Sequence, residues 1–322
     1  MVILFCNVNA NHSPKREWSY EEEFKMKKSI IYVNHGVVSL IDEATANILR
    51  QMGVKTLAIH AGEFHADDLS ASAIFALKFK EVLIYRVFSI SETDDYDYIV
   101  DIGMSYDEVK FFDHHQKIEE YADGVKPCGA TLFAEAMLDT ELYKALYERV
   151  LRPIAVQDNG QKELLSTYPN LMFGWVGAMN PVWNNSEQNS DEQFAKALEM
   201  AIPMIEQVIA QIKAEKEAQE IVASARKEAN GRILVLPQYA PWHNWVVEQD
   251  AVALFVVHPS NRGGFMVQCV PPSLEDGFSQ RRPLPSAWLE NRPQGCTFVH
   301  RGLFCAAFES ESSAVEALLQ LF

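Results

Sequence analysis

The segment TLAIHAGEFHADD, residues 56–68, passes from an apolar run through a polar loop into the start of an amphipathic stretch. The apolar run predicts a strand over 56–59, and the stretch that follows predicts a helix over about 68–79. The pattern then repeats, with further strands expected over 82–88, 98–102 and 110–112. Strands that alternate with helices are typical of the βαβ units of a mostly parallel sheet, so the sequence predicts an α/β fold.

Side chains that can bind metal ions follow three of the expected strands. They are His60, His65 and Asp67 after the first strand, Asp101 at the end of a later one, and Asp113-His114-His115 after the last. Because the carboxyl ends of parallel strands meet in one crevice, we expect these side chains to lie close together. Carboxylates and imidazoles suit Mn²⁺, Co²⁺ or Mg²⁺ better than a closed structural zinc site, which favours thiolates. Two such ions that share a carboxylate promote displacement at phosphorus.

Each of these residues also has an ordinary structural explanation. His60 alone could be a half-buried, hydrogen-bonded residue at a strand end. Asp67 could cap the helix that begins beside it, and Asp101 could be a turn aspartate. Together these explanations do not account for the pattern, because three independent strand ends carry ligand-type side chains in the same position.

The chain is acidic, with 28 Lys and Arg against 44 Asp and Glu and a net charge of −16 over 322 residues. This charge excludes a protein that coats duplex DNA through a broad basic face, so any contact with nucleic acid must be local. Bound metal ions and a few arginines could supply that local positive field.

The five cysteines are widely spaced and include no CxxC pair, which favours a reducing compartment over a disulfide framework. The opening residues 1–6 are apolar but lack a basic leader and a following cleavage site, so no secretory signal is expected. No run approaches eighteen apolar residues, and therefore no membrane span is expected.

Four segments are expected along the chain. They are an N-terminal appendage of unknown role (1–54), a metal-binding catalytic domain (55–188), a long helix (189–230) and a C-terminal α+β domain (231–322). Ser190, with Gln193 three residues on, has the chemistry of a helix N-cap. Pro203 predicts a kink in the long helix, and Gly231 predicts its end. This helix is expected to be a bracket between the domains.

An ordered series of motifs resembles one known family. IHAGEFHADD at 59–68, VDIG at 100–103 and FDHHQ at 112–116 are similar to motifs of the melanocyte proliferating gene family, a branch of the DHH phosphoesterase superfamily. Later motifs follow in the same order: QDNG at 157–160, MNPVWN at 179–184, QCVP at 268–271, RRPLP at 281–285 and GCTFVH at 295–300. Asp-His-His alone is a weak signal, whereas the series is specific and covers residues from about 56 to 322.

The resemblance implies a doubly wound DHH domain, a smaller substrate-binding domain, and manganese-type dinuclear hydrolysis of phosphoesters, with 3′-to-5′ RNA exonuclease activity in characterised members. It implies one ion held by His60, His65 and Asp101, and a second held by Asp67, Asp101, His114 and Asp158. Asp101 is then the bridge. Asp113 is expected to orient the histidines, and His115 to face the phosphoryl group as a charge stabiliser or acid.

Arg281 and His300 lie within family-like motifs of the C-terminal domain, and we expect both to bind substrate. The expected substrate is single-stranded RNA or a short oligonucleotide, the expected cofactor is two divalent ions, and a homodimer is left open. Two alternatives remain: a small-molecule phosphatase or pyrophosphatase on the same metal frame, and a non-enzymatic metal-binding scaffold. A bacterial protein of this kind is expected in the cytoplasm, and a eukaryotic one in the nucleus or mitochondrion.

Overall fold

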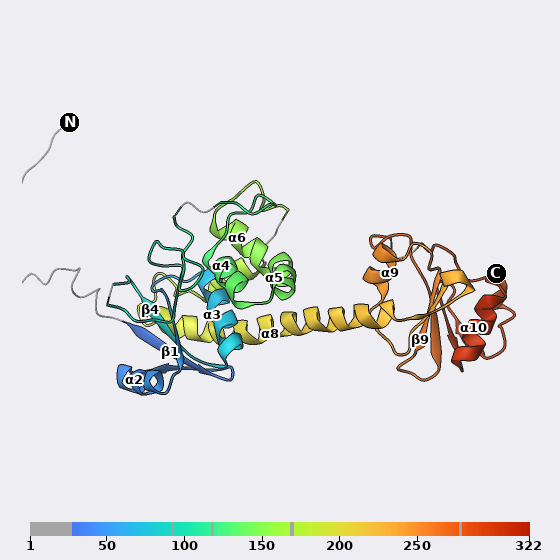
Figure 1. The fold of residues 1–322 in the computed structure, drawn as a ribbon, viewed down its shortest axis with the longest axis horizontal. Helices are drawn as coiled ribbons and strands as arrows, with labels where there is room; N and C mark the ends of the chain where they lie inside the picture. The colour runs from blue at the N-terminus through green and yellow to red at the C-terminus, as the bar shows by residue number, and fades with distance from the viewer. Residues whose placement is uncertain (1–27, 92, 117–118, 168–170, 277–278) are drawn as a thin grey trace, which may run out of the picture. The chain divides into compact units, whose positions relative to one another are not determined.

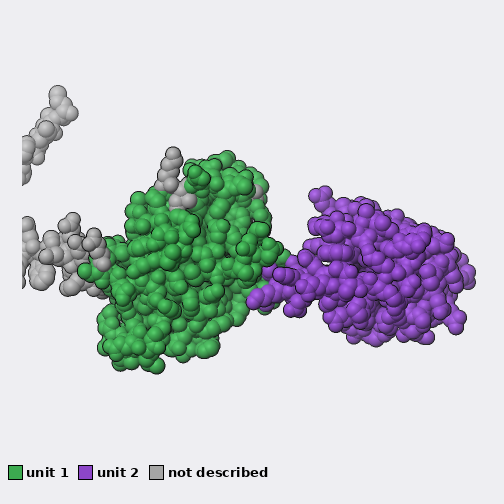
Figure 2. Space-filling model, in the orientation of Figure 1, with its two compact units in different colours: residues 1–209 green, residues 210–322 purple. Residues whose placement is uncertain are grey.

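The computed structural model describes residues 28–91, 93–116, 119–167, 171–276 and 279–322. The chain divides into two compact units, residues 1–209 and 210–322 (Figure 2). The opening residues 1–6, on which the expected absence of a secretory signal rests, lie outside the described ranges. No helix within those ranges is both long and apolar enough to cross a membrane.

The first unit is built on a mixed six-stranded sheet with the strand order β2-β1-β4-β3-β5-β6. Its strands are β1 (Ser29–Asn34), β2 (Val37–Ile41), β3 (Lys55–His60), β4 (Glu81–Val87), β5 (Tyr98–Val100) and β6 (Phe111–Phe112). Strands β1 and β4 are labelled in Figure 1. The neighbours β4, β3, β5 and β6 run parallel, in agreement with the sequence pattern. The sheet as a whole is mixed, because β1 pairs antiparallel with both β4 and β2. Residues 29–41 therefore extend the sheet, which the sequence did not predict.

Helices lie on both faces of this sheet. The helices of the first unit that precede residue 190 are α2 (Glu43–Gln51), α3 (Ala66–Phe79), α4 (Gly129–Met137), α5 (Thr140–Leu146), the π-helix η1 (Tyr147–Leu151), α6 (Arg152–Asp158) and α7 (Leu171–Met179). Ala46 and Leu49 of α2 pack against one face, in a cluster that includes Ile99 of β5. The neighbouring Tyr98 points to the opposite face, because side chains alternate along a strand, and its ring contacts Phe75 of α3 there.

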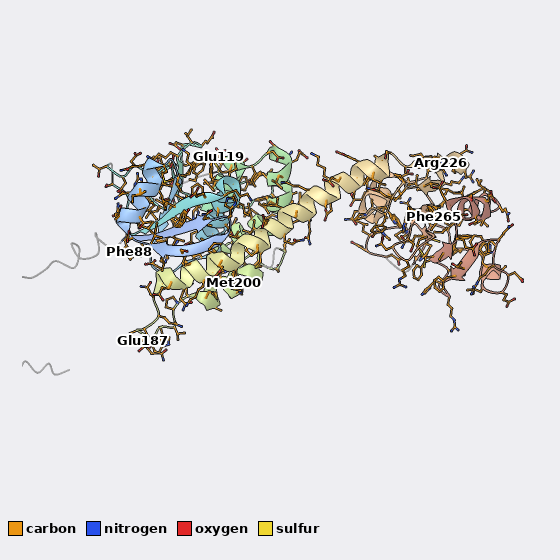
Figure 3. The ribbon with its side chains drawn as sticks, turned by 90° about the horizontal axis from the view of Figure 1, so that it is seen from below. Phe88, Glu119, Glu187, Met200, Arg226 and Phe265 are labelled. Carbon is orange, nitrogen blue, oxygen red and sulfur yellow. The ribbon has the colours of Figure 1, made fainter. Side chains whose placement is uncertain are left out.

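The long helix α8 (Ser190–Ala223) begins in the first unit and ends in the second. Phe194, Leu198 and Ile205 are buried on one side of it, as their spacing predicts. Met200 is exposed on the same helix (Figure 3). The sequence therefore predicts both the existence of α8 and the face that it buries.

The end of α8 differs from the prediction. The helix ends at Ala223, before the predicted stop at Gly231. The next residues form the strand β7 (Arg226–Glu228), which pairs antiparallel with β8 (Ile233–Val235), and this pairing replaces the last expected turns of helix. Pro203 lies inside the helix, and the kink expected there stays a prediction.

The second unit contains another mixed six-stranded sheet, with the order β11-β12-β10-β9-β8-β7. Besides β7 and β8 it comprises β9 (Phe255–Pro259), β10 (Phe265–Cys269), β11 (Cys296–Val299) and β12 (Cys305–Phe308). The helices are α9 (His243–Gln249), α10 (Glu311–Leu319) and the short 3₁₀ turns η2 (Ala229–Gly231) and η3 (Ser286–Leu289). Strands and helices in this unit agree with the expected smaller α and β domain.

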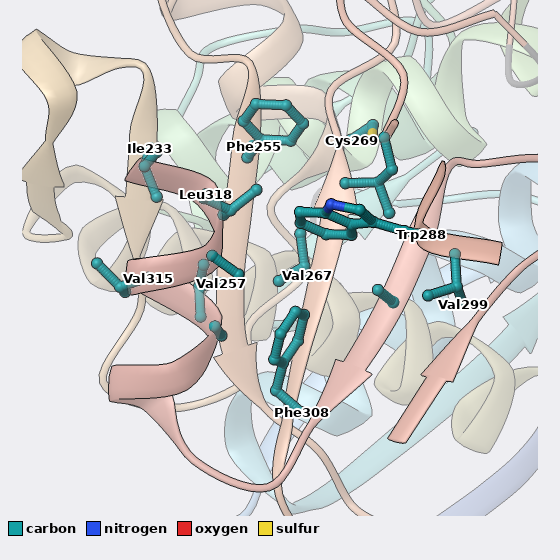
Figure 4. Close-up of a cluster of buried hydrophobic side chains, with 14 of the residues drawn as sticks. Ile233, Phe255, Val257, Val267, Cys269, Trp288, Val299, Phe308, Val315 and Leu318 are labelled. Carbon is teal, nitrogen blue, oxygen red and sulfur yellow. The ribbon is translucent and has the colours of Figure 1, made fainter. Parts of the chain in front are cut away.

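Each face of the second sheet has its own core. On one face, Val257 and Val267 belong to a hydrophobic cluster that also contains Trp288 and Phe308 (Figure 4). Leu318 of α10 packs in the same cluster. On the other face, Leu234 and Val256 pack with Trp242, Val246 of α9 and the end of α8 at Val222. Because side chains alternate along a strand, neighbouring residues of β8 and β9, such as Ile233 and Leu234, belong to opposite cores.

Candidate metal centre

Five of the six expected metal ligands line one cavity of about 1150 Å³ in the first unit. His60 ends β3, Asp101 follows β5 and His114 follows β6, so three neighbouring parallel strands deliver them to the same edge of the sheet. His65 directly precedes α3, and Asp158 is the last residue of α6. The sixth expected ligand, Asp67, is buried in the first turn of α3.

Asp101 lies between two imidazoles. Its Oδ2 is 3.4 Å from Nε2 of His60, and its Oδ1 is 3.2 Å from Nε2 of His114. The residue adopts a left-handed backbone conformation with φ of 56°, and its N–H donates to the carbonyl of Phe112 on β6. The turn after β5 thus places one carboxylate so that each oxygen faces a different histidine.

Two groups of residues could each hold a metal ion, because the ligand atoms within each group lie within 4.8 Å of one another. One group is Asp67, His114 and Asp158, which belongs to the set expected for the second ion; the other is Asp101, His114 and His115. His60 and His65 fall in neither group, although their ring centroids are 5.6 Å apart. The division of the six ligands between two ions therefore stays a prediction.

The carboxylate of Asp67, a residue of α3, accepts hydrogen bonds from main-chain N–H groups at the start of α4. Its Oδ2 accepts a hydrogen bond from the N–H of Gly129 (2.9 Å), and its Oδ1 accepts one from the N–H of Ala130 (2.6 Å). Both donors belong to the first turn of α4, whose free N–H groups and dipole favour a carboxylate. The alternative that Asp67 caps α3 is not what the structure shows, since His65 is the N-cap residue of that helix.

Gly129 is placed where a side chain has no room. A Cβ atom there would lie 3.0 Å from Oδ2 of Asp67 and 3.0 Å from Cβ of Asp101. We expect Gly129→Ala to shift both carboxylates and to weaken Mn²⁺ binding about 10- to 100-fold, the effect typical of disturbed ligand support. Calorimetric titration with Mn²⁺ measures this. Gly174→Ala in α7 is the matched control, because a Cβ at Gly174 meets nothing within 4 Å; equal Mn²⁺ affinity of the two variants would contradict the expectation.

Asp113 contacts His115 rather than His114. Oδ1 of Asp113 lies 2.7 Å from the ring atom Nδ1 of His115 and also accepts the main-chain N–H of His115 at 2.9 Å. Oδ2 of Asp113 accepts the main-chain N–H of Met104 at 2.7 Å. Asp113 is buried, whereas 53% of the His115 side chain is exposed and the residue lines the cavity. With Nδ1 engaged by Asp113, Nε2 is the ring atom of His115 that remains for a ligand.

In the metal-free protein, burial and close charges shift the pKa of several groups in the cluster towards the protonated form. Burial opposes the charge on His60 and His114, but the adjacent carboxylate of Asp101 and other nearby carboxylates outweigh burial and raise the pKa of each to about 9. Burial and neighbouring carboxylates raise the pKa of Asp67 to about 7 and that of Asp158 to about 8. Burial also acts on Asp101, but the close imidazoles of His114 and His60 prevail and lower its pKa. A bound metal ion would displace such protons.

The donor set fits divalent cations. Oδ1 of Asp101 is buried and has no hydrogen-bond partner among the described residues, although Nε2 of His114 is only 3.2 Å away. A carboxylate and an imidazole that converge in this way without a hydrogen bond are arranged as ligands of a common ion. The thiol of Cys128 beside Asp67 is fully buried, burial raises its pKa well above the usual value, and it belongs to neither of the two candidate ligand groups.

Two side chains to which the sequence assigned no role, Arg86 and Asn180, support the loop between His60 and His65. Arg86 of β4 is fully buried and donates from Nη2 to the carbonyl of Gly62 at 2.8 Å. The side chain of Asn180 holds Phe64 at two points, accepting its N–H at 2.9 Å and donating to its carbonyl at 2.7 Å. The sequence signal for Arg86 was its charge within the hydrophobic run of residues 82–87 of β4.

Arg281 and His300 lie in the second unit. Arg281 donates to three main-chain carbonyls, of Val247 (3.0 Å), Asp250 and Ala253 (3.0 Å), so both of its Nη atoms already hold its own domain together. Nδ1 of His300 accepts the N–H of Gly302 at 2.9 Å. The substrate-binding role of the two residues stays a prediction.

The fold and the cluster define a class: an α/β protein with a candidate metal centre at the carboxyl edge of parallel strands. Residues 56–320 match the model of the MYG1 exonuclease family, which is described as an uncharacterised protein family (UPF0160). The chain belongs to this family, which confirms the resemblance found in the motifs.

Three relatives illustrate the similarity. The chain is 27% identical to a MYG1 protein of Saccharomyces cerevisiae over 320 residues, covering 81% of this chain and 94% of the yeast protein. It is 24% identical to the human MYG1 exonuclease, covering 82% of this chain and 85% of the human protein. A MYG1 protein of Dictyostelium discoideum is 28% identical, with 81% and 94% covered.

Proposed function

We propose that this chain is a metal-dependent phosphoesterase that hydrolyses the phosphodiester bonds of RNA or short oligonucleotides from the 3′ end. The observation that carries the proposal is the position of Asp101, whose two oxygens face His60 and His114 within one cavity. Relatives named as exonucleases support a nucleic acid as the substrate.

The residues of the cavity have distinct proposed tasks. His60, His65 and Asp101 would hold one divalent ion, and Asp67, Asp101, His114 and Asp158 would hold the other, with Mn²⁺ the first choice and Mg²⁺ or Co²⁺ as alternatives. Such ions supply an activated water and neutralise phosphate charge. Asp113 would accept from Nδ1–H of His115 and stabilise its imidazolium form, in which Nε2 could donate to a phosphoryl oxygen as charge accumulates there.

His115→Ala is expected to leave two Mn²⁺ ions bound and to lower kcat about 10²- to 10³-fold, the scale for loss of one donor to a developing anion. The substitution removes a half-exposed side chain, so the fold is expected to persist. Steady-state kinetics with Mn²⁺ and a metal analysis of the same sample make the test. A kcat equal to that of the wild type would show that His115 does not have this role.

The proposed function is tested by incubating the purified protein and Mn²⁺ with 5′-labelled single-stranded RNA, dinucleotides and pyrophosphate. We expect a ladder of RNA products shortened one nucleotide at a time from the 3′ end. Internal cuts at early times would indicate an endonuclease. Turnover of pyrophosphate with RNA untouched would favour the small-molecule phosphatase, and no turnover at all would favour the scaffold.

A further inference from the structure

The cavity that holds the metal cluster has an uneven distribution of charge. Four carboxylates line it, because Glu119 and Glu120 are added to the expected ligands Asp101 and Asp158. Among the described residues that line it, Lys126 is the only lysine or arginine. Among these described lining residues, a phosphate that enters the cavity therefore finds one permanently charged side chain of opposite sign.

The backbone at Lys126 is fixed by the turn that carries a metal ligand. The N–H of Lys126 donates to Oε1 of Gln161 at 2.8 Å, and Nδ2 of Asn159 donates to the carbonyls of Lys126 (3.2 Å) and Pro127 (3.0 Å). Asn159 directly follows Asp158 in the chain. Lys126 and the ligand Asp158 are therefore held in a constant relation by side-chain to main-chain hydrogen bonds.

The Lys126 side chain itself is exposed to the cavity, and no ion pair involving it is found within the described ranges. Other lysines of the first unit, such as Lys28 and Lys55, are paired with aspartates. A lysine beside carboxylates that forms no internal pair keeps its ammonium group available for a ligand. An ammonium is a strong point-charge partner for phosphate.

We propose that Lys126 binds a phosphate group of the substrate beside the metal centre, and that Glu119 and Glu120 restrict this part of the cavity to a single phosphate. The proposal rests on the proposed function and names a recognition residue for it. Both glutamates are exposed, and Glu119 is labelled in Figure 3. Their negative charges repel a second phosphate, which favours the end of a chain over a continuous backbone.

The test compares Lys126→Met with the wild type, both loaded with Mn²⁺. We expect an unchanged Mn²⁺ content and a dissociation constant for adenosine 5′-monophosphate, measured by calorimetry, that rises about tenfold through loss of one charge-assisted hydrogen bond. KM for an RNA pentamer should rise similarly, with kcat much less affected. Lys126→Arg should largely restore both values.

Two further variants sharpen the result. Lys144→Met is the matched control, because Lys144 is exposed on α5 and pairs only with Glu141 in the described part of the chain, and it should behave as the wild type. The double variant Glu119→Gln/Glu120→Gln should act in the opposite direction and lower KM for the pentamer about threefold, on the scale of exposed charge pairs.

Wild-type affinity for adenosine 5′-monophosphate and wild-type KM in Lys126→Met would overturn the role of Lys126. Failure of the proposed function looks different, because it appears in the wild-type protein as turnover of pyrophosphate without RNA cleavage. In that case the role of Lys126 is judged by KM for pyrophosphate, which must rise in Lys126→Met if this lysine binds phosphate.

Discussion

Asp101→Asn is expected to reduce turnover by at least about 10³-fold and to lower the Mn²⁺ content below two ions per chain. The carboxylate of Asp101 faces His60 with one oxygen and His114 with the other, and loss of its charge affects both predicted ion positions. Asparagine is a better replacement than alanine, because it tolerates the left-handed backbone found at this position. The fold should therefore remain intact.

The measurements are kcat with RNA and Mn²⁺ content by elemental analysis, with circular dichroism as the check on folding. Asp95→Ala is a suitable control, because it removes an exposed aspartate of the same unit that does not line the metal cavity. A folded Asp101→Asn protein that keeps two Mn²⁺ ions and wild-type kcat would show that Asp101 is not the bridge.

Arg86→Met is expected to reduce the free energy of unfolding of the first unit by about 3–5 kcal/mol, the usual cost of breaking a buried ion pair on one side. Arg86 is fully buried, pairs with Asp191 at the start of α8, and donates to Ser190 and to the carbonyl of Gly62. Its guanidinium also lies over the ring of Phe194, 4.6 Å from the centroid. Removal of Arg86 leaves Asp191 and the Gly62 carbonyl without these donors.

The same substitution should weaken Mn²⁺ binding, because Gly62 lies in the loop between the predicted ligands His60 and His65. Urea denaturation of the metal-free protein measures the stability, and calorimetry measures the affinity. Arg226→Met is the matched control: Arg226 also forms two ion pairs, with Glu228 and Glu311, but it is exposed, so its loss should cost at most about 1 kcal/mol. Equal destabilisation by both variants would contradict the role of Arg86.

The pattern of polar residues at strand ends predicted which side chains of the first unit lie together in the candidate metal centre. The positions of His60, Asp101 and His114 could be predicted because the carboxyl ends of parallel strands share one edge. The hairpin of β1 and β2 could not be predicted in the same way. Its local signal was the turn at His35 and Gly36, both with positive φ, but its pairing with β4 joins residues about fifty positions apart, such as Ile31 and Ile84.

Side chains that lie outside the recognisable motifs were the hardest to predict. Lys126 and Arg86 belong to no motif, and their positions matter only because folding brings Asn159 and Gly62 next to them. Arg281, in contrast, lies in a family-like motif, and the motif suggested phosphate binding. In the structure its guanidinium donates to carbonyls of its own domain. A sequence reveals the type of a side chain, whereas its hydrogen-bond partners depend on tertiary structure.

The central claim is that this cavity binds two divalent ions that share Asp101. An anomalous difference map at the manganese absorption edge, from crystals grown with Mn²⁺, tests it most directly. We predict two peaks per chain, one on the His60 side of the Asp101 carboxylate and one on the His114 side. A single four-coordinate ion, or peaks that lie outside this cavity, would contradict the claim.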